Sequence, residues 1–200
     1  MKTLLAIFIL LLCFSLFAIY PEAPQGTGSF EDPFLITSLD NLYWITLTPG
    51  VWNQHFVQTA DIDASDSALI SSPEPNTAGW IPIGQSSPFF TGSYDGQGYK
   101  IMNLYMHRPT MYYAGLFGYL NGARLNRIHL RDAMILGQDY TGGLAGVANS
   151  GTVINNCSVT GSVTGHTNVG GFLGYCDGSG TTNSYTQATV NASSDQVGGF

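Results

Sequence analysis

The sequence Gly115-Leu-Phe-Gly-Tyr119 returns as Gly143-Leu-Ala-Gly-Val147 and again as Gly171-Phe-Leu-Gly-Tyr175, each time at a spacing of 28 along the chain. A fourth copy begins at Gly199-Phe200, where the sequence ends. A fixed period of about 20–50 residues is typical of solenoids, in which each unit buries its apolar face against the next unit. The repeat therefore predicts a stack of similar coils at residues 111–200, truncated in the fourth.

The middle of each repeat is out of step by one residue, and this offset separates corners from strands. Residues 156–160 (NCSVT) match residues 183–187 (NSYTQ) at a spacing of 27, whereas the Gly-rich segments keep a spacing of 28. The third repeat regains the missing residue between Val190 and its next Gly pair. Because both changes fall in Gly-, Ser- and Asn-rich stretches, we place those stretches in loops, which absorb insertions. The intervening segments are then strands, which must keep their register.

Residues at equivalent positions of successive repeats form columns of similar side chains. In the second repeat Cys157, Val159 and Val163 alternate with polar neighbours, as in a strand with one face turned inward. Stacked parallel strands, each bonded to its counterpart one coil later at about 4.8 Å, would satisfy the backbone. Pairs of glycines at 142/143, 170/171 and 198/199 fit corners where a Cβ would clash. The columns are Leu116, Leu144, Phe172 and Phe200; Ile128, Cys157 and Ser184; Leu130, Val159 and Thr186; and Ile135, Val163 and Val190.

The composition agrees with an all-β fold, a parallel β-helix (solenoid) with 28-residue coils. Only 10 % of the residues are charged, which is too few for amphipathic helices with charged outer faces. The formal net charge of −7 argues against a nucleic-acid partner, because neutralising phosphates requires clustered Lys and Arg. We expect the arginines to be solvated or paired with carboxylates such as Asp132 and Asp139, with a patch for an acidic glycan as the alternative. They are Arg108, Arg124, Arg127 and Arg131.

The start of the chain is typical of an export signal. A positively charged residue precedes an almost wholly apolar run at residues 4–17, and the small residue Ala18 follows it. We predict a signal peptide at residues 1–18, with cleavage as late as residue 23, and hence a secreted or cell-surface protein. A membrane anchor is one alternative, although the apolar run is shorter than the ~20 residues of a spanning helix. A lipoprotein anchored at Cys13 is the other.

Three regions follow the signal. Residues 19–30 form a Pro-, Gly- and Ser-rich entry segment, residues 31–110 a non-repeating block that caps the β-helix, and residues 111–200 the repeats. In the block we predict a helix at residues 39–47 with Ser38 as its N-cap. Strands are expected at residues 34–37, 55–58 and 80–84, a surface loop at 71–79 and a tight turn at 95–98.

With these elements in place, the chain resembles a known family. Its repeats are similar to the GLUG motif, whose Gly-Leu-x-Gly units match Gly115–Gly118 and Gly143–Gly146. The block before them resembles the segment that commonly precedes such repeats, so the resemblance covers nearly all of the chain from Gly26 onward. The first repeat departs from the pattern at residues 124–129 (RLNRIH), where the family has a small polar run. The landmarks in the block are Gly28–Ile36, Thr59–Asp63, Trp80–Gly84 and Phe90–Leu104.

The resemblance implies a right-handed parallel β-helix on an exported bacterial surface protein. GLUG motifs occur in tandem in large secreted and cell-surface proteins of bacteria, among them adhesin-like proteins and non-catalytic regions of some IgA-specific metallopeptidases. The repeats carry no catalytic residue in that family, so the resemblance implies none for this chain.

Candidate chemistry in the mature chain is sparse. Asp61 and Asp63 lie two apart, with Asp66 nearby, and could contribute to a Ca²⁺ site, but no ligand loop follows and we favour a structural role. Asp95 has no evident partner acid for catalysis and is expected to shape its turn. The sequence has no His-Glu-x-x-His spacing and no Gly-x-Ser-x-Gly elbow. We therefore predict no enzyme, no catalytic, metal-binding or cofactor-binding residue and no cofactor. The histidines are His55, His107, His129 and His166.

Two cysteines, Cys157 and Cys176, follow the predicted signal. Export permits a disulfide, but the two residues occupy different columns of the repeat, so the pattern does not bring them together. We expect two free, buried thiols that pack as small apolar groups.

Aromatic residues are dense before the repeats. A β-helix needs a cover over its open end, and large rings provide one, so we expect these residues to cap the solenoid. Stacking on sugars is the alternative role. The residues are Trp44, Trp52, Trp80, Tyr99, Tyr105, Tyr112 and Tyr113.

Together these features predict a non-catalytic structural or adhesin-like stalk of an exported bacterial surface protein. We expect partners among host or matrix glycans or proteins, no nucleic acid, a membrane only through regions after residue 200, and further repeats of the same chain. Two alternatives stay open: the non-catalytic N-terminal region of a secreted peptidase, and a carbohydrate-active β-helix. The last coil is expected to have an uncovered end that exposes Phe172 and Phe200.

Overall fold

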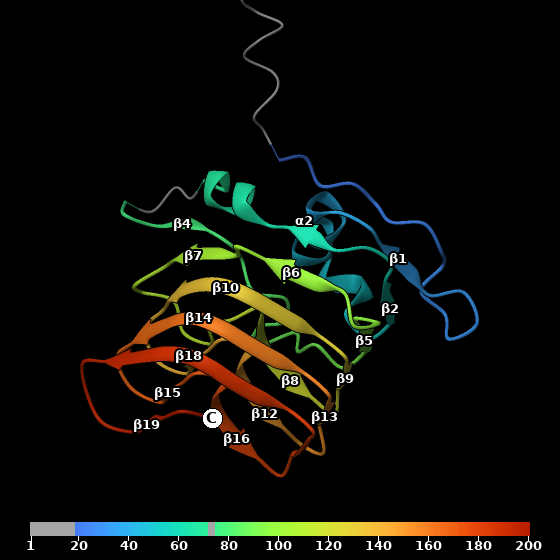
Figure 1. Cartoon of the computed structure of the whole chain (residues 1–200). Helices are drawn as coiled ribbons and strands as arrows, with labels where there is room; N and C mark the ends of the chain where they lie inside the picture. Colours follow the sequence, from blue (N-terminus) through green and yellow to red (C-terminus); the bar gives the residue numbers. More distant parts are fainter. Residues whose placement is uncertain (1–18, 72–74) are drawn as a thin grey trace, which may run out of the picture.

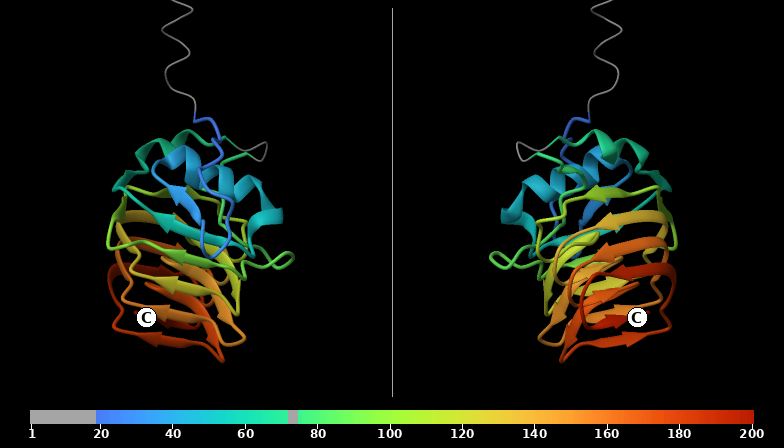
Figure 2. Two further views of the ribbon diagram at one scale, coloured as in Figure 1. Left: turned by 90° about the vertical axis from the view of Figure 1, so that its right-hand side faces the viewer. Right: turned by 90° about the vertical axis from the view of Figure 1, so that its left-hand side faces the viewer.

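The computed structural model describes residues 19–71 and 75–200; the predicted signal peptide lies outside the described residues. The described chain is a parallel β-helix of about four turns, and its coils follow one another at a spacing of about 28. Figure 1 shows the coils stacked from helix α2 (Leu39–Leu47) at one end to the last strands at the other. The two side views in Figure 2 show the same strands as parallel layers. The predicted all-β solenoid is therefore confirmed.

The strands within the described residues form four sheets, and each sheet runs along the stack. Sheet A contains β1 (Phe34–Ile36), β2 (His55–Gln58), β5 (Ser93–Asp95), β9 (Arg124–Asn126), β13 (Val153–Asn155) and β17 (Gly180–Thr182). Sheet B contains β3 (Ile62–Asp63), β6 (Lys100–Met102), β7 (Tyr105–His107), β10 (His129–Leu136), β14 (Ser158–Gly165) and β18 (Tyr185–Ala192), with β4 (Ala78–Gly79) antiparallel to β7.

The other two sheets and the short helices complete the coils. Sheet C contains β8 (Phe117–Asn121), β12 (Ala145–Asn149) and β16 (Leu173–Asp177). Sheet D contains β11 (Thr141–Gly142), β15 (Val169–Gly170) and β19 (Val197–Gly198). Two 3-10 helices, η1 (Pro49–Val51) and η2 (Ser65–Leu69), lie in the block before the repeats.

Equivalent side chains lie in single files through the interior, as the repeat predicts. In sheet B, Leu130 is paired with Val159 and Val159 with Thr186, while Ile135, Val163 and Val190 form a second file. Leu116, Leu144 and Phe172 are each completely buried. Phe172 stacks on Phe200, with ring centroids 4.6 Å apart. The predicted columns are therefore confirmed.

The one-residue offsets begin at corners, as predicted, but the offset of the first repeat ends inside a strand. Arg124 pairs with Val153 at a spacing of 29, and Val153 pairs with Gly180 at a spacing of 27. The strands of sheet C keep a spacing of 28 throughout. In the first repeat the extra residue is accommodated by a bulge between Leu130 and Ala133, after which β10 and β14 pair at a spacing of 28.

The interior becomes more polar toward the last coil because hydroxyl and thiol groups satisfy the backbone there. The Ser184 Oγ accepts a hydrogen bond from the Cys157 N–H (3.0 Å) and donates one to the Thr182 carbonyl (2.8 Å). One coil earlier, the Cys157 Sγ accepts from the Ile128 N–H and donates to the Asn155 carbonyl, both at 3.4 Å. A small polar side chain in this column therefore links two coils where a wholly apolar one would leave an N–H without an acceptor.

The paired glycines take corners where neighbouring chain comes too close for a side chain. A Cβ on Gly143 would lie 2.6 Å from the Gly171 carbonyl oxygen, and one on Gly170 would lie 1.9 Å from that of Leu173. The predicted clash is confirmed for the pairs at 142/143 and 170/171. Gly199 has nothing within 4 Å, because no coil of the described chain lies beyond it.

The block at residues 31–110 pairs with the repeats in the same sheets. Helix α2 has the predicted bounds, and the Ser38 Oγ accepts from the Asn41 N–H at 3.3 Å. The strands expected at 34–37 and 55–58 are present as β1 and β2. The turn at 95–98 is confirmed, with the Tyr99 N–H bonded to the Gly96 carbonyl at 2.9 Å.

Two expectations for the block are wrong. Residues 80–84 form no strand: only Ile83 makes a bridge, to Phe117, because Pro82 has no N–H to donate. The segment at 71–79 ends in strand β4 instead of remaining a loop to its end. Residues 72–74 of this segment lie outside the described part of the chain.

The last coil is open, but not as expected. Phe172 is completely buried, because the stacked ring of Phe200 covers it, and Phe200 itself is 52 % exposed. The expectation that both rings would be exposed is therefore wrong for Phe172.

Candidate functional site

The acidic pair at Asp61 and Asp63 holds strands together. The Asp61 carboxylate accepts from the Lys100 N–H at 2.8 Å. Asp63 accepts from the Asn103 side-chain amide (3.1 Å) and the Ser65 N–H (3.0 Å), and these bonds lower the pKa of its carboxyl. Both residues thus serve the predicted structural role. No three His, Cys, Asp or Glu side chains of the described residues gather into a group that could hold a metal ion.

The arginines do not converge on one patch. Arg108 is buried, and its guanidinium donates to the Trp80 and Gly79 carbonyls. Arg127 forms an ion pair with both carboxylate oxygens of Asp95. The pairing with a carboxylate is as predicted for Arg127, but the partner is Asp95, the last residue of β5 in the block. Hydrogen bonding to this carboxylate raises the pKa of Arg127.

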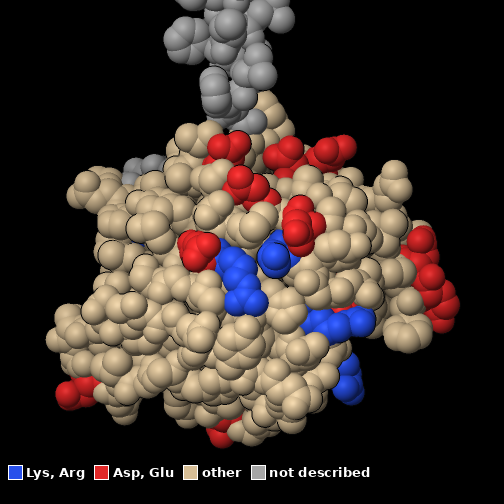
Figure 3. Space-filling view, viewed as in Figure 1, with Lys and Arg blue, Asp and Glu red and all other residues tan. Residues whose placement is uncertain are grey.

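Charged side chains are unevenly distributed on the face formed by sheet B. Figure 3 shows Lys and Arg together with several Asp and Glu toward the α2 end of this face. Most of its surface toward the last coil is uncharged. The Arg131 guanidinium donates to the Tyr185 hydroxyl (3.4 Å), a contact that lowers the pKa of this phenol.

The histidines lie apart from one another and make separate contacts. The Nδ1 of His55 lies 2.7 Å from the Ser93 Oγ, and that of His129 lies 2.8 Å from the Ser158 Oγ. Partial burial lowers the pKa of His129. His166 pairs with the Asp139 carboxylate at 2.9 Å.

The two cysteines are free, as expected, but only one is buried. Burial raises the pKa of the Cys157 thiol to about 11. Cys176 is exposed, although it lies in register with the fully buried Ala148 of the coil before it. Cys176 is exposed because it belongs to the last described coil. The expectation of two buried thiols is therefore wrong for Cys176.

The aromatic residues expected to cap the solenoid include buried and exposed side chains. Trp52 and Trp80 are buried completely or nearly so, and their indole N–H groups donate to the Ile45 and Leu116 carbonyls. These two rings fill the core of the block. Tyr112 is 50 % exposed.

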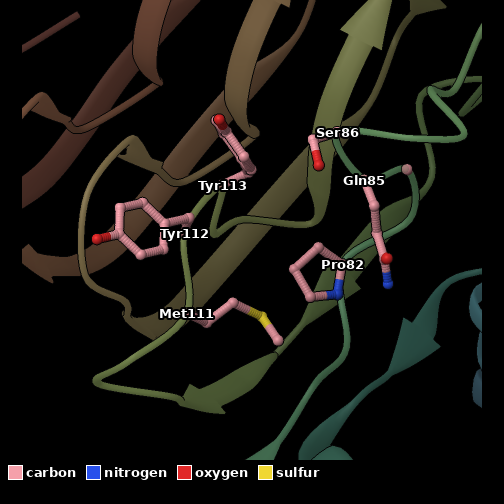
Figure 4. Close-up of a pocket in the computed structure, with 7 residues that line it drawn as sticks. Pro82, Gln85, Ser86, Met111, Tyr112 and Tyr113 are labelled. Carbon is pink, nitrogen blue, oxygen red and sulfur yellow. The ribbon is translucent and has the colours of Figure 1, made fainter.

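Tyr112 and Tyr113 border the cleft that we select as the candidate site. This cleft has a volume of about 430 Å³ and is drawn in Figure 4. Met111, Tyr112 and Tyr113 line one wall, while residues 82–86 line the other. Its lining residues are Pro82, Gly84, Gln85, Ser86, Met111, Tyr112 and Tyr113, and none of them is charged.

One wall of the cleft exists because the chain leaves sheet C and returns to it. The Ile83 N–H donates to the Leu116 carbonyl (3.1 Å), and the Ile83 carbonyl accepts from the Gly118 N–H (2.9 Å). The Phe90 N–H donates to the Tyr119 carbonyl, and the Phe90 carbonyl accepts from the Asn121 N–H, both at 3.0 Å. Between them the chain turns outward at Gly84, whose φ of +86° lies in the left-handed region that favours glycine. The Gln85 N–H is bonded to the Pro88 carbonyl (2.9 Å), which closes this outward turn.

The opposite wall is a corner fixed by the next coil. The Tyr113 N–H donates to the Asp139 carbonyl (3.1 Å), and the Gln138 N–H donates to that of Met111 (2.8 Å). Tyr113 has a φ of +60°, an unusual backbone conformation for a bulky residue that the surrounding hydrogen bonds maintain.

Tyrosine rings continue from this corner along the stack. We call Tyr113, Tyr119, Tyr140 and Tyr175 the tyrosine row. The ring centroid of Tyr113 lies 5.4 Å from that of Tyr119 and 5.3 Å from that of Tyr140. Tyr140 meets Tyr175 edge to face at 5.9 Å. The row therefore extends the aromatic surface of the cleft over three coils.

The last glycine of each Gly-x-x-Gly repeat makes room for the corner that carries these tyrosines. A Cβ on Gly146 would lie 2.6 Å from the Tyr113 Cα, and one on Gly174 would lie 2.7 Å from the Tyr140 carbonyl carbon. The repeat glycines thus allow each tyrosine corner to pack against the following strand of sheet C. Of the row, sequence reasoning singled out only Tyr113. The signal for the others was the tyrosine beside these glycines, at Tyr119 and Tyr175.

The chain is similar to segments of two much longer proteins. It is 38 % identical over 134 residues to "Halomucin" of Haloquadratum walsbyi, which covers 65 % of this chain. It is 32 % identical over 173 residues to a "Putative Gly-rich membrane protein" of Evansella cellulosilytica, which covers 78 % of this chain. The chain spans only 1 % and 18 % of the lengths of these two relatives. No protein-family model matches the chain.

A search of solved structures finds a distant likeness. The chain has a TM-score of 0.38 and 16 % identity to "a putative immunoglobulin A1 protease from Bacteroides ovatus", over 90 % of this chain and 78 % of that one. Within residues 19–71 and 75–200, none of the helices has the length and apolar character needed to cross a membrane.

Proposed function

We propose that this chain is a non-catalytic stalk segment of an exported surface protein, in which the β-helix is the stiff part and its outer faces meet a partner. The names of the two relatives support the location, since the similarity extends over 65 % and 78 % of this chain. We also infer that the chain is a GLUG-motif protein with a cleaved signal peptide at residues 1–18. The two Gly-x-x-Gly glycines that make room for the tyrosine corners support the motif assignment.

The observation that carries the stalk proposal is the unbroken register of sheet A. Its six strands run from β1 to β17, so the backbone ladder continues from the block into the last coil. Five steps of about 4.8 Å give a length of roughly 24 Å. Because each coil is bonded only to its neighbours, such a stack acts as a stiff spacer that further coils can lengthen.

The absence of catalysis is part of the proposal, and the pairing of the acids supports it. Asp95 is paired with Arg127, Asp139 with His166, and Asp63 with the Asn103 amide. Each of these carboxylates thus has a structural partner. Asp95 and Asp139 each face a basic side chain, whereas glycoside hydrolysis requires a pair of carboxyl groups.

The location is tested on the full-length protein in its source organism. An antibody against residues 111–200 should bind intact cells as well as permeabilised ones, and the N-terminal peptide of the exported protein should begin between residues 19 and 24. Binding only after permeabilisation would overturn the surface location, and an intact Met1 would overturn the cleaved signal.

The stalk role is tested by replacing the segment in the full-length protein. Exchanging residues 31–200 for an unrelated β-helix of equal length should preserve the exposure of the rest of the protein at the cell surface, whereas deleting them should impair this exposure. Equal exposure after deletion would contradict the spacer role. Product formation by the purified chain on a panel of polysaccharides would contradict its non-catalytic nature.

A further inference from the structure

We infer that the cleft between residues 82–86 and 111–113, together with the tyrosine row, binds a neutral oligosaccharide. This inference rests on the proposed function, because it names the partner chemistry that an outer face of the stalk would take. The volume of about 430 Å³ falls within the range of about 300–1,000 Å³ that is usual for small-molecule sites.

The lining of the cleft decides the charge of the ligand. None of its seven lining residues is charged, in a chain whose formal net charge is −7. Asp139, whose backbone carbonyl accepts from the Tyr113 N–H, binds the imidazole of His166 and the Thr167 N–H through its carboxylate. An ionic ligand would therefore find no counter-charge in the cleft, whereas a neutral one needs none.

The polar groups of the cleft are available to a ligand. The side chains of Gln85, Ser86, Tyr112 and Tyr113 make no hydrogen bond to other described residues. Together they offer an amide and three hydroxyl groups, each able to donate and to accept. Sugar hydroxyls also donate and accept, so they match this set of groups better than a purely apolar ligand would.

The apolar groups of the cleft suit the carbon face of a sugar ring. Tyr112 is 50 % exposed, and Met111 points toward Pro82 across the cleft in Figure 4. Tyrosine combines an apolar ring with a polar tip that tolerates water, which suits a ligand that is itself amphipathic. The tyrosine row continues this surface beyond the cleft, so a chain of several sugar units has room along the axis of the stack.

Both walls are held in place before a ligand arrives. The outward turn at residues 84–88 is closed by its own backbone bond and is joined to sheet C at Ile83 and Phe90. The corner at Tyr113 is bonded to the next coil at Asp139. A fixed site loses less conformational entropy on binding than a flexible one, which favours a weakly interacting ligand such as a sugar.

The test uses the purified chain with selectively ¹³C-labelled methionine methyl groups. We would add neutral hexasaccharides of glucose, mannose, galactose and xylose, an acidic polyuronate of equal length, and a proline-rich peptide. A neutral hexasaccharide should shift the Met111 methyl resonance in a saturable manner. It should leave the methyl resonance of Met134, which is 56 % exposed on sheet B, unchanged.

Variants then locate the binding. Tyr112→Ala and Gln85→Ala should each weaken the affinity, Tyr112→Ala by about tenfold or more. Tyr99→Ala, which removes an exposed ring elsewhere, should leave the affinity unchanged. A circular dichroism spectrum like that of the parent shows that each variant is folded.

Three outcomes would overturn the inference. They are no shift of Met111 with any neutral hexasaccharide at millimolar concentration, an equal affinity of the Tyr112→Ala variant, and a response only to the polyuronate or to the proline-rich peptide. These outcomes concern the cleft alone. The surface location and the spacer role are decided separately, by the antibody and exchange experiments.

Discussion

The block at residues 31–110 and the repeats at residues 111–200 build the same sheets from different materials. In sheet B the strands of the block are only two or three residues long, and a helix, 3-10 turns and long loops separate the strands of the block. In sheet B the repeats contribute three strands of eight residues each. The largest fully buried side chains of the block are Trp52, Phe56, Trp80, Phe90 and Tyr94.

The difference shows that side-chain packing holds the block together, whereas backbone pairing between coils holds the repeats together. Where successive coils differ in path, few backbone bonds join them, and large rings fill the irregular space. Where the coils are alike, the backbone ladder is continuous, and most interior positions hold Leu, Ile, Val, Cys or even Ser and Thr, with Phe117 and Phe172 as the large buried rings. The block should therefore depend on side-chain volume, and the repeats on the close approach of backbone to backbone. The following predictions test this division.

The largest effect is expected from Trp80→Ala in the block. The ring is fully buried, and its indole N–H donates to the Leu116 carbonyl of the first repeat at 3.0 Å. Removing it should lower the free energy of unfolding by about 3–5 kcal/mol. Urea unfolding measures this, with Tyr99→Ala, 40 % exposed, as a control that should change it by less than about 0.5 kcal/mol. Equal losses from the two variants would contradict the role of ring volume.

An intermediate effect is expected from Gly143→Ala in the repeats. The added Cβ would meet the Gly171 carbonyl oxygen at 2.6 Å and a methyl of Val159 at 2.5 Å. The loss should be about 1–3 kcal/mol, as for overpacked cores. Gly199→Ala is the matched control, because it is the equivalent glycine two coils later and has nothing within 4 Å. If both variants lost the same stability, close backbone approach would not be what the glycine provides.

A smaller effect is expected from Thr186→Val in the last coil. Its hydroxyl lies 3.1 Å from the Gly171 carbonyl oxygen and accepts from the Ala188 N–H at 3.2 Å. Losing these bonds should cost about 0.5–1.5 kcal/mol, since valine otherwise suits a strand. Thr189→Val, on the exposed face of the same strand, is the control. A gain in stability from Thr186→Val would show that the column prefers apolar residues after all.

The smallest effect concerns Asp63 and pH. The Asn103 amide and the Ser65 N–H hold the pKa of this carboxyl below 3.8. Its ionised form therefore stabilises the fold at neutral pH, and this contribution is lost as the pH falls through the lowered pKa. Asp63→Ala should be less stable than the parent near neutral pH, with a difference that shrinks in acid.

Unfolding of both proteins at several pH values measures this difference. A difference that grows as the pH falls would contradict the sign. Combining Asp63→Ala with Asn103→Ala provides the control, because the two changes should not be additive if the amide is the main partner.

The period and the columns of the repeats could be predicted because each coil repeats the same local pattern of apolar residues and glycines. Leu116, Leu144 and Phe172 occupy one file, and the spacing changes from 28 to 29 or 27 at the corners between sheets C and A. The capped helix at Leu39–Leu47 was equally visible, since its N-cap and its apolar positions are local signals.

The remaining features depend on contacts between distant segments. The sequence does not show that Asp95 pairs with Arg127, because the contact joins the end of β5 in the block to the corner after β9. The cleft likewise depends on residues 82–86 leaving the sheet beside β8, which no local pattern indicates. Aromatic density drew attention to Tyr112 and Tyr113. Their joining with Tyr140 and Tyr175 follows only from the stacking of the coils.

The bulge in β10 and the offset corners have a consequence for how such a gene can change. A single codon gained or lost at a corner shifts the local numbering, yet the next coil resumes its place, as the spacings of 29 and 27 around an average of 28 illustrate. Lineages can therefore drift in length at these points without altering the interior. The same tolerance does not extend to the glycines of sheet C, because the backbone of the neighbouring corner leaves no room for a side chain at those positions.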